Sequence, residues 1–507
     1  MKADLVIGID ASTTATKAIA FDRQGRAVAE SRVAVPLSQP RPGWFEQDVS
    51  DWTGSTAAAL RQITRKVSAR RVAAVAVSNQ RESFAQFDER GKALGPGILW
   101  LDERARQEVQ DLSALLGRDM IHRLSGKMPD LTPCLYSCLW LARHKPKLWR
   151  KTCKTAEVSG VLAHFLTGQW RTSVASADPM GLLDIQARDW SPRLLEAVKL
   201  TRGQVPDLVD CGDVIGETTE AAAKLTGLRV GTLLIAGGGD GQCAGTGANI
   251  FQKGRAYLNL GTASVSGRYG PAYAADAAFR TLIAVAERGY SFETAIRTGT
   301  FLLSWLVEEV FGEVPQRNPR IYEKLEAEAS AGPIGSGGLA LVPYWSGVMT
   351  PYWDTGARGV IAGLSGSHTR GDIYRAAMES LALEQTMMTN RVAAVTGAID
   401  HYAIVGGGSK SDLWCQIFAD ASGRVVKRLE TVEASALGAA MAAAKGAGWY
   451  ASIVDAAAAM SGKTAKTFRP RMKAHARYAD LLSVYVDLWP ALAGWNKRMQ
   501  EFAKGNA

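Results

Sequence analysis

The chain has 507 residues, which exceeds the usual size of a single hydrophobic core, so we expect two large domains. Its 47% hydrophobic and 21% charged residues are typical of a well-buried globular protein and exclude a largely disordered one. The net charge is +10, but the basic residues are scattered, whereas a nucleic-acid-binding surface should be a concentrated patch. We therefore expect no nucleic-acid partner, and the basic surface suits an anionic small molecule.

The cysteines and the N-terminal residues point to a cytoplasmic location. The six cysteines have neither zinc-binding nor thioredoxin spacing, so we expect packed free thiols in a reducing compartment. Asp4 and Asp10 interrupt any signal-peptide core, and no apolar run reaches membrane-spanning length. We therefore predict a cytoplasmic protein with no membrane partner.

The chain opens with a hairpin whose turn is rich in small and hydroxyl residues. Leu5 to Asp10 is an apolar run that predicts a buried strand, and Lys17 to Asp22 predicts a second strand. The turn between them is Ala11-Ser-Thr-Thr-Ala-Thr16, which follows the carboxyl group of Asp10. A third strand begins near Arg26, so the pattern predicts a meander of strands.

Polar residues follow the next predicted strand. Helical spacing over Ser50 to Ser68 precedes the buried strand Val72 to Val77, which ends in Ser78-Asn-Gln-Arg-Glu82. Polar residues at the end of a buried strand in an α/β sheet lie where ligands usually bind. For Arg81 and Glu82, ion pairing at the surface is the plainer alternative.

The stretch from Leu233 to Ser264 combines two ingredients of phosphoryl transfer. Gly237-Gly-Gly-Asp240 places a carboxylate on glycine-rich backbone, where it can accept a proton from a hydroxyl group. About twenty residues later, Gly261-Thr-Ala-Ser264 forms a turn whose N–H and O–H groups can hold phosphate oxygens. The alternative for Asp240 is that it only caps a helix, since Asp is a favoured N-cap residue.

The two hydroxyl-rich turns suggest an internal duplication. Each consists of a strand, a small or hydroxyl turn and a second strand, and they lie some 250 residues apart, at Asp10 and at Gly261. We predict one such hairpin in each domain. Coincidence is the alternative, because turns of Gly, Ser and Thr are common.

The second half of the sequence contains another glycine-rich junction. Phe301 to Phe311 and Gly371 to Ala394 predict helices, and Tyr402 to Val405 predicts a buried strand. That strand leads into Gly406-Gly-Gly-Ser-Lys-Ser411, a junction that can cradle an anion or a nucleotide. Further on, the alanine-rich stretch 434–448 predicts a closely packed helix, and the last aromatics predict helix core: Tyr478, Tyr485, Trp489 and Trp495.

The order and spacing of these motifs resemble those of the FGGY carbohydrate kinases, which belong to the superfamily of hexokinase, actin and Hsp70. The resemblance runs nearly end to end, and it rests on Asp10-Ala-Ser-Thr-Thr14, Pro42-Gly-Trp-Phe-Glu-Gln-Asp48, Asn79-Gln-Arg-Glu82, Gly237-Gly-Gly-Asp240, Gly261-Thr-Ala-Ser264, Pro351-Tyr-Trp-Asp354, Ala357-Arg-Gly359 and Gly406-Gly-Gly-Ser409.

This resemblance implies an α/β fold of two ribonuclease-H-like domains of the βββαβα type, with substrates in the cleft between them. Residues 1–249 would bind the sugar and carry the catalytic base, Asp240, and residues 250–507 would bind the nucleotide. Asp10 would hold Mg²⁺ together with Asp240. ATP would be held by Thr13, Thr14, Gly261, Thr262, Gly407, Gly408 and Ser411.

The resemblance also implies the acceptor site, formed by Arg81, Glu82, Trp100, Asp102 and Asp240. The segment Gly237 to Asp240 is similar to xylulokinases, whereas Asn79 to Glu82 is similar to glycerol kinase. Glycerol kinase has an aromatic residue near the position of Thr132, and the smaller residue here leaves space for a larger acceptor. We therefore predict phosphorylation of a ketopentose such as D-xylulose.

Several alternatives stay open at this point. Glycerol or another short polyol, and the signal accepted by the quorum-signal kinases of the same family, are alternative acceptors. A regulator that binds ATP and sugar without catalysis is the alternative of another class, although Asp240 speaks against it. A homodimer is one assembly compatible with the resemblance.

Overall fold

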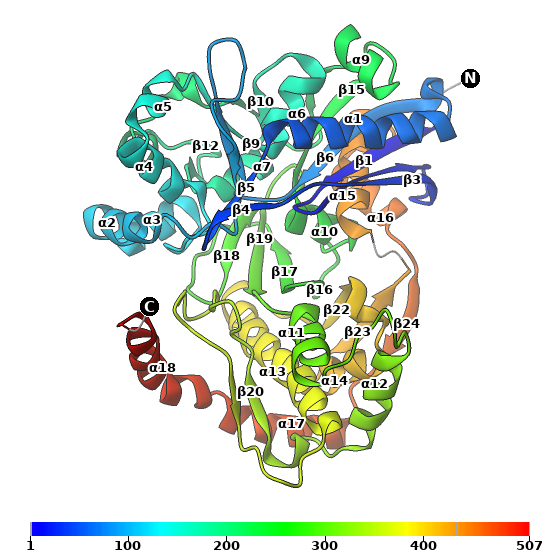
Figure 1. The fold of residues 1–507 in the computed structure, drawn as a ribbon. Helices are drawn as coiled ribbons and strands as arrows, with labels where there is room; N and C mark the ends of the chain where they lie inside the picture. Colours follow the sequence, from blue (N-terminus) through cyan, green and yellow to red (C-terminus); the bar gives the residue numbers. More distant parts are fainter. Residues whose placement is uncertain (1–2, 431–432, 506–507) are drawn as a thin grey trace.

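The computed structural model describes residues 3–430 and 433–505 and has a mixed α/β architecture. Two large mixed sheets, one from each half of the chain, lie one above the other in Figure 1, and helices pack against them. Among the described residues, none of the helices has the length and apolar character that a membrane span requires.

The first sheet contains the predicted N-terminal meander. Its strand order is β14-β15-β6-β1-β2-β3, with β1, β2 and β3 antiparallel and β1, β6 and β15 parallel. The parallel pairing places the ends of β6 and β15 side by side, with Asn79 opposite Gly239. The strands are β1 (Leu5–Ala11), β2 (Ala15–Phe21), β3 (Ala27–Ala34), β6 (Val72–Asn79), β14 (Val214–Glu217) and β15 (Leu233–Gly239).

The second sheet repeats this topology, which confirms the predicted duplication. Its order is β18-β19-β17-β16-β22-β23-β24; β16, β17 and β19 form the antiparallel meander, and β16, β22 and β23 are parallel. The strands are β16 (Arg255–Leu260), β17 (Ser264–Gly270), β18 (Arg280–Ile283), β19 (Tyr290–Ile296), β22 (His401–Val405), β23 (Val425–Leu429) and β24 (Thr464–Phe468). With the helices between the strands, each half has the βββαβα order of a ribonuclease-H-like domain.

The long predicted helices are confirmed, with one local difference. They appear as α1 (Val49–Lys66), α13 (Arg370–Thr396) and α15 (Ala434–Gly446). The predicted helix at 301–311 divides into α11 (Thr300–Trp305) and a π-helical turn, η4 (Leu306–Val310).

The first half adds a small sheet of β4 (Ser38–Arg41), β5 (Trp44–Gln47), β8 (Gly97–Ile98), β7 (Phe84–Phe87) and β9 (Lys154–Glu157). Further helices include α4 (Cys134–His144), α6 (Val158–Thr167), α14 (Asp412–Ser422), α17 (Met472–Tyr485) and α18 (Leu488–Gly505).

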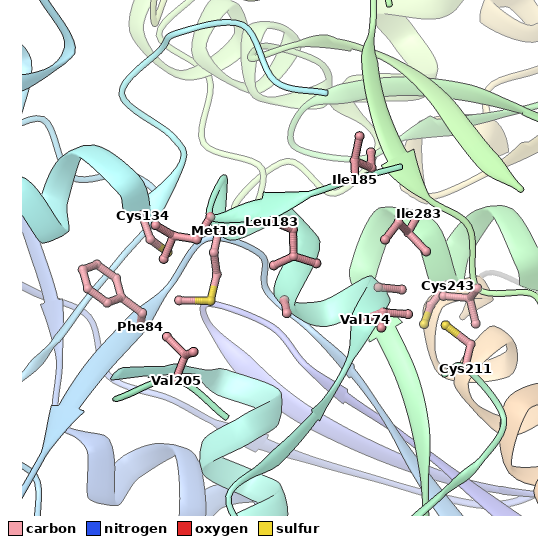
Figure 2. Packing of buried hydrophobic residues seen from close by; sticks show 14 of the residues in the cluster. Phe84, Cys134, Val174, Met180, Leu183, Ile185, Val205, Cys211, Cys243 and Ile283 are labelled. Atoms are coloured by element: carbon pink, nitrogen blue, oxygen red, sulfur yellow. The ribbon is translucent and has the colours of Figure 1, made fainter. Parts of the chain in front are cut away.

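Two helices from the second half of the chain pack against the sheet of the first half. Helices α15 and α16 (Ile453–Met460) belong to the second half by sequence, yet their buried side chains share a hydrophobic core with side chains of the first sheet. Figure 1 shows the two helices in orange beside the strands of that sheet. The packing is close: a Cβ atom on Gly8 of β1 would lie 1.8 Å from the carbonyl oxygen of Ala436. Figure 2 shows part of this core, in which Ile283 of β18 lies near Val174 of the first half. A boundary at residue 250 therefore describes the order of the sequence, while residues 434–460 complete the first domain in space.

Two sequence predictions about packing are wrong in part. Of the C-terminal aromatics, Tyr478, Tyr485 and Trp489 are buried, but Trp495 of α18 is 48% exposed. All six cysteines are free, as expected, but Cys153 is exposed while the other five are buried.

Candidate active site

Asp240 is the first residue of helix α10 (Asp240–Gly247), directly after the glycine-rich end of β15. The N-cap residue of this helix is Gly239, so Asp240 does not occupy the capping position. Its Oδ1 accepts a hydrogen bond from the backbone N–H of Gly241 (2.7 Å), and 40% of its side chain is exposed. Asp240 is thus a carboxylate on rigid backbone that a ligand can reach.

Arg81 and Glu82 form buried ion pairs, so the alternative of surface ion pairing is wrong for them. Arg81 lies with Nε 3.0 Å from Oδ1 of Asp240, and its Nη1 donates to Oε1 of Glu293 over 2.8 Å. Oε1 of Glu82 accepts from Nη1 of Arg280 (2.8 Å). Burial raises the pKa of Glu82, although the charges of Arg280 and Arg81 oppose this effect.

Trp100 and Asp102 differ in what they offer to a ligand. The indole Nε1 of Trp100 donates to Oγ1 of Thr13 (2.9 Å), so the ring lies beside the first hydroxyl-rich turn. Asp102 is buried, and both of its oxygens accept from Arg104, while Oδ2 also accepts from the N–H of Phe45. Because its carboxylate is fully engaged, Asp102 stabilises this loop, and we do not retain it as an acceptor-binding residue.

The two predicted phosphate turns each present one exposed threonine. Thr14 is exposed, whereas the hydroxyl of Thr13 donates to Oε1 of Gln80 (3.0 Å) and accepts from Trp100. In the second turn Thr262 is exposed, and its backbone, like that of Gly261, is tied to the start of α11 by hydrogen bonds from 299 and 300. The geometry is that of two small turns, one on each sheet.

In the glycine-rich segment Gly406 to Ser411, one glycine borders open space and another is packed against a side chain. A Cβ atom on Gly407 would meet nothing within 4 Å, whereas one on Gly408 would lie 2.6 Å from the ring of Trp414. Ser411 is the N-cap of α14, and its Oγ accepts from the N–H of Trp414 (3.1 Å). Gly407 therefore offers open space, while Gly408 and Ser411 shape the turn.

Comparison with known proteins identifies the family. The model of the N-terminal domain of the FGGY family of carbohydrate kinases matches residues 5–247, and the model of its C-terminal domain matches residues 256–447. The chain belongs to this family. FGGY kinases are phosphotransferases with an alcohol group as acceptor, they use ATP, and their substrates are sugars or polyols. A regulator without catalytic activity is therefore set aside.

Relatives of the FGGY family align along nearly the whole chain. A xylulose kinase of Bacillus subtilis (strain 168) is 28% identical over 506 residues, which cover 98% of this chain and 99% of the relative. A glycerol kinase of Gloeobacter violaceus is 29% identical over 468 residues, 90% of each chain. The crystal structure of xylulose kinase from Rhodospirillum rubrum superposes with a TM-score of 0.89 at 26% identity, covering 97% of this chain and 100% of that one.

The residues of this FGGY chain fit a magnesium ion bound together with phosphates. Asp10 accepts a hydrogen bond from Oγ of Ser78 (3.3 Å), and burial together with the negative charge of Asp240 raises its pKa to about 7. A cation beside these two carboxylates would relieve that unfavourable arrangement. Within the described ranges there is no cluster of three or more metal-binding side chains, and Mg²⁺ usually uses only one or two carboxylates plus phosphates and water.

The sequence does not reveal the buried groups that surround Arg81 and Glu82. Glu293 of β19, Arg280 of β18 and Tyr257 of β16 all come from the second half of the chain. The only signal in the sequence is a charged residue inside an otherwise apolar strand, as for Arg280 between Phe279 and Thr281-Leu-Ile283. A buried charge needs a partner, but the sequence does not say which one.

Proposed function

We propose that this FGGY kinase transfers the γ-phosphoryl group of ATP to a terminal hydroxyl of a ketopentose such as D-xylulose, with Asp240 as the base. The observation that carries this proposal is the state of the Asp240 carboxylate. Its Oδ1 is held by Gly241 and Arg81, and among the described residues no hydrogen bond engages Oδ2. A fixed carboxylate with one free oxygen suits proton abstraction.

In the proposed step, the acceptor oxygen forms a bond to the γ-phosphorus while the bond between that phosphorus and the β,γ-bridging oxygen breaks. The hydroxyl proton passes to Oδ2 of Asp240, and ADP leaves. Phosphoryl transfer of this kind depends on alignment and charge neutralisation more than on covalent catalysis. Bound Mg²⁺ would neutralise part of the charge on the phosphate oxygens.

We assign the binding of MgATP to both turns and to the glycine-rich loop. Asp10, with Asp240 nearby, would hold the ion largely through water. Thr14 and Thr262 are exposed, so they would contact phosphate oxygens, with Thr13 and Gly261 shaping the two turns. Gly407 would lie along the adenosine, because it offers open space.

The acceptor site is proposed from the side chains around Asp240. Arg81 donates and Glu82 accepts, so together they would orient neighbouring hydroxyl groups, with the ring of Trp100 beside them. The hydrogen bonds of the described residues engage only Oε1 of Glu82, which leaves Oε2 for the acceptor.

The choice of a ketopentose rests on the family resemblance and on one comparison. The resemblance implies that Thr132 stands near the place of an aromatic residue of glycerol kinase, and the xylulose kinase of Bacillus subtilis aligns with nearly the whole chain. A short polyol such as glycerol is the second candidate. The segment Asn79 to Glu82 favours it, as does the similarity to a glycerol kinase.

A coupled assay of ADP release with pentuloses, hexuloses, glycerol and erythritol tests this proposal. We expect the highest kcat/KM for a pentulose. A preference for glycerol would replace the first candidate by the second. No acceptor-dependent turnover with any of these compounds, despite tight binding of ATP, would contradict both.

A further inference from the structure

Arg81 lies between two carboxylates that come from different halves of the chain. Its Nε is 3.0 Å from Oδ1 of Asp240, and its Nη1 donates to both oxygens of Glu293, over 2.8 and 3.0 Å. The guanidinium group thus uses one nitrogen for each partner. Only 10% of the Arg81 side chain is exposed, and Glu293 is fully buried.

Glycines on both sides of Asp240 make room for this arrangement. A Cβ atom on Gly239 would lie 2.5 Å from Cγ of Arg81, and one on Gly241 would lie 2.5 Å from Oε2 of Glu293. Any larger residue at either position would displace the arginine or the glutamate. The glycines around Asp240 are therefore required by the contact between Arg81 and Glu293, as well as by the backbone turn.

Glu293 is itself held by three donors. Nη2 of Arg280 donates to its Oε1 (2.5 Å), and the hydroxyl of Tyr257 donates to its Oε2 (2.9 Å), in addition to Arg81. Burial alone would raise the pKa of Glu293, but the charges of Arg81 and Arg280 lower it to about 2. Glu293 is therefore a permanent negative charge with a fixed position.

We propose that Glu293 is a positioning residue for the reaction: it fixes the guanidinium group of Arg81, which in turn holds the carboxylate of Asp240 so that Oδ2 faces the acceptor. This inference rests on the proposed function, since it takes Asp240 as the base.

The reason lies in the geometry of arginine. A guanidinium group beside a single carboxylate tends to pair with both of its oxygens. Such a bidentate pair would engage Oδ2 of Asp240 and weaken it as a proton acceptor. The nitrogens that could form such a pair with Asp240 are Nε and Nη2. Because both oxygens of Glu293 accept from Nη1, they fix the plane of the guanidinium group, and in this orientation Nε lies 3.0 Å from Oδ1 while no hydrogen bond of the described residues joins Nη2 to Asp240. The catalytic base in the first half of the chain is thus oriented by a carboxylate from the second half.

A double-mutant cycle tests whether Glu293 acts through Asp240. We would measure kcat and KM of the wild type, Glu293→Gln, Asp240→Asn and the double variant with the best acceptor of the panel. Glu293→Gln should lower kcat by about 10- to 100-fold, as expected for a misplaced catalytic group, and leave the KM for MgATP within about twofold. In the Asp240→Asn background the same change should alter the residual kcat by less than about twofold, because the residue through which it acts is already lost.

A merely structural role predicts a different result. Equal fold-losses of kcat in both backgrounds, or an unchanged kcat in Glu293→Gln, would overturn the proposal. An Asp240→Asn protein as active as the wild type would instead contradict the proposed base, so the two failures are distinguishable.

A second pair of variants keeps the test informative if Glu293→Gln does not fold. Tyr257→Phe removes one hydrogen bond to Glu293 and leaves Arg81 and Asp240 intact. Tyr344→Phe is its matched control, because the Tyr344 hydroxyl donates to the buried Glu384 over the same 2.9 Å, elsewhere in the second half. We expect Tyr257→Phe to lower kcat by about threefold to tenfold, as for the loss of one ordinary hydrogen bond, and Tyr344→Phe to leave it within about twofold. Equal effects of the two changes on kcat would overturn the proposal.

Discussion

Trp100 donates a hydrogen bond from its indole Nε1 to Oγ1 of Thr13, over 2.9 Å. This bond joins Trp100, a residue of the proposed acceptor site, to the hydroxyl-rich turn after Asp10, which we propose to bind phosphate. The hydroxyl of Thr13 also donates to Gln80, so both of its hydrogen-bonding roles are filled by protein groups. The neighbouring Thr14 is exposed and is therefore the threonine that a phosphate can reach. The two neighbouring threonines therefore have separate tasks in our proposal.

Gly407 and Gly408 should respond differently to the same substitution. Gly408→Ala places a Cβ atom against Trp414, so we expect a lower Tm, in keeping with an overpacking penalty of about 1–3 kcal/mol. Gly407→Ala meets no protein atom, so it should keep its Tm but raise the KM for ATP, by about tenfold if the methyl group opposes the nucleotide. Thermal unfolding and initial rates measure both effects. A normal KM for ATP in Gly407→Ala would show that the nucleotide lies elsewhere.

The affinity for MgATP should depend on pH through Asp10. The pKa of this carboxyl is raised to about 7, so it gains a proton as the pH falls below that value, and the protonated carboxyl group is a poor ligand for the metal. We expect binding to weaken by about tenfold between pH 8 and pH 6, with release of a proton on binding near pH 7. Calorimetry in two buffers of different ionisation enthalpy measures this proton. Asp10→Asn should bind MgATP weakly at both pH values; a variant with the pH dependence of the wild type would contradict the assignment.

Thr132 offers a test of acceptor size. It is buried, and its hydroxyl donates to Oδ2 of Asp130 (2.8 Å). Thr132→Tyr should raise the KM for a pentulose by about tenfold or more and spare glycerol, because the larger ring fills the proposed space. Thr132→Ser, which keeps the hydroxyl, is the control and should change neither value appreciably. Equal losses for both acceptors would place Thr132 outside the acceptor site.

Glu384 should make stability depend on pH. Burial raises its pKa from 4.5 to about 7, although Tyr344 and Tyr485 donate to its Oε1. Because the pKa of Glu384 is higher in the folded state than in the unfolded state, its contribution to the free energy of unfolding is complete below about pH 4.5 and is lost as the pH rises through 7. Glu384→Gln should therefore have a Tm about 2–6 °C above that of the wild type at pH 8 and a similar Tm at pH 5. Glu309→Gln, at an exposed position, is the control and should behave like the wild type.

Much of the fold could be predicted because it depends on local patterns. The apolar strands before Asp10 and Gly261 and the hydroxyl turns after them are visible in the sequence, and their repetition correctly indicates two similar sheets. The alanine-rich helix α15 was also predictable. Its partner was not, because small residues indicate close packing but do not identify the strand against which a helix packs, here β1.

The sequence motifs of the candidate site could be predicted, but the ion-pair partners of its charged residues could not. The sequence places Arg81 after a buried strand, but its partner Glu293 lies more than two hundred residues away. Pairing across such a separation depends on how the sheets meet, which no local pattern records. Likewise, nothing in the sequence distinguishes Asp102, whose oxygens are engaged by Arg104, from a carboxylate that is free to bind a ligand.

Asp240→Asn tests most directly whether Asp240 accepts the proton of the acceptor hydroxyl. The measurement is the rate of ADP formation at saturating MgATP and acceptor, with calorimetric binding of both ligands as the control for folding. We predict that turnover falls by about 10²- to 10⁴-fold while both dissociation constants stay within a few fold, because a positioned base contributes a rate factor of that size. Turnover close to that of the wild type in a correctly folded Asp240→Asn protein would contradict the account.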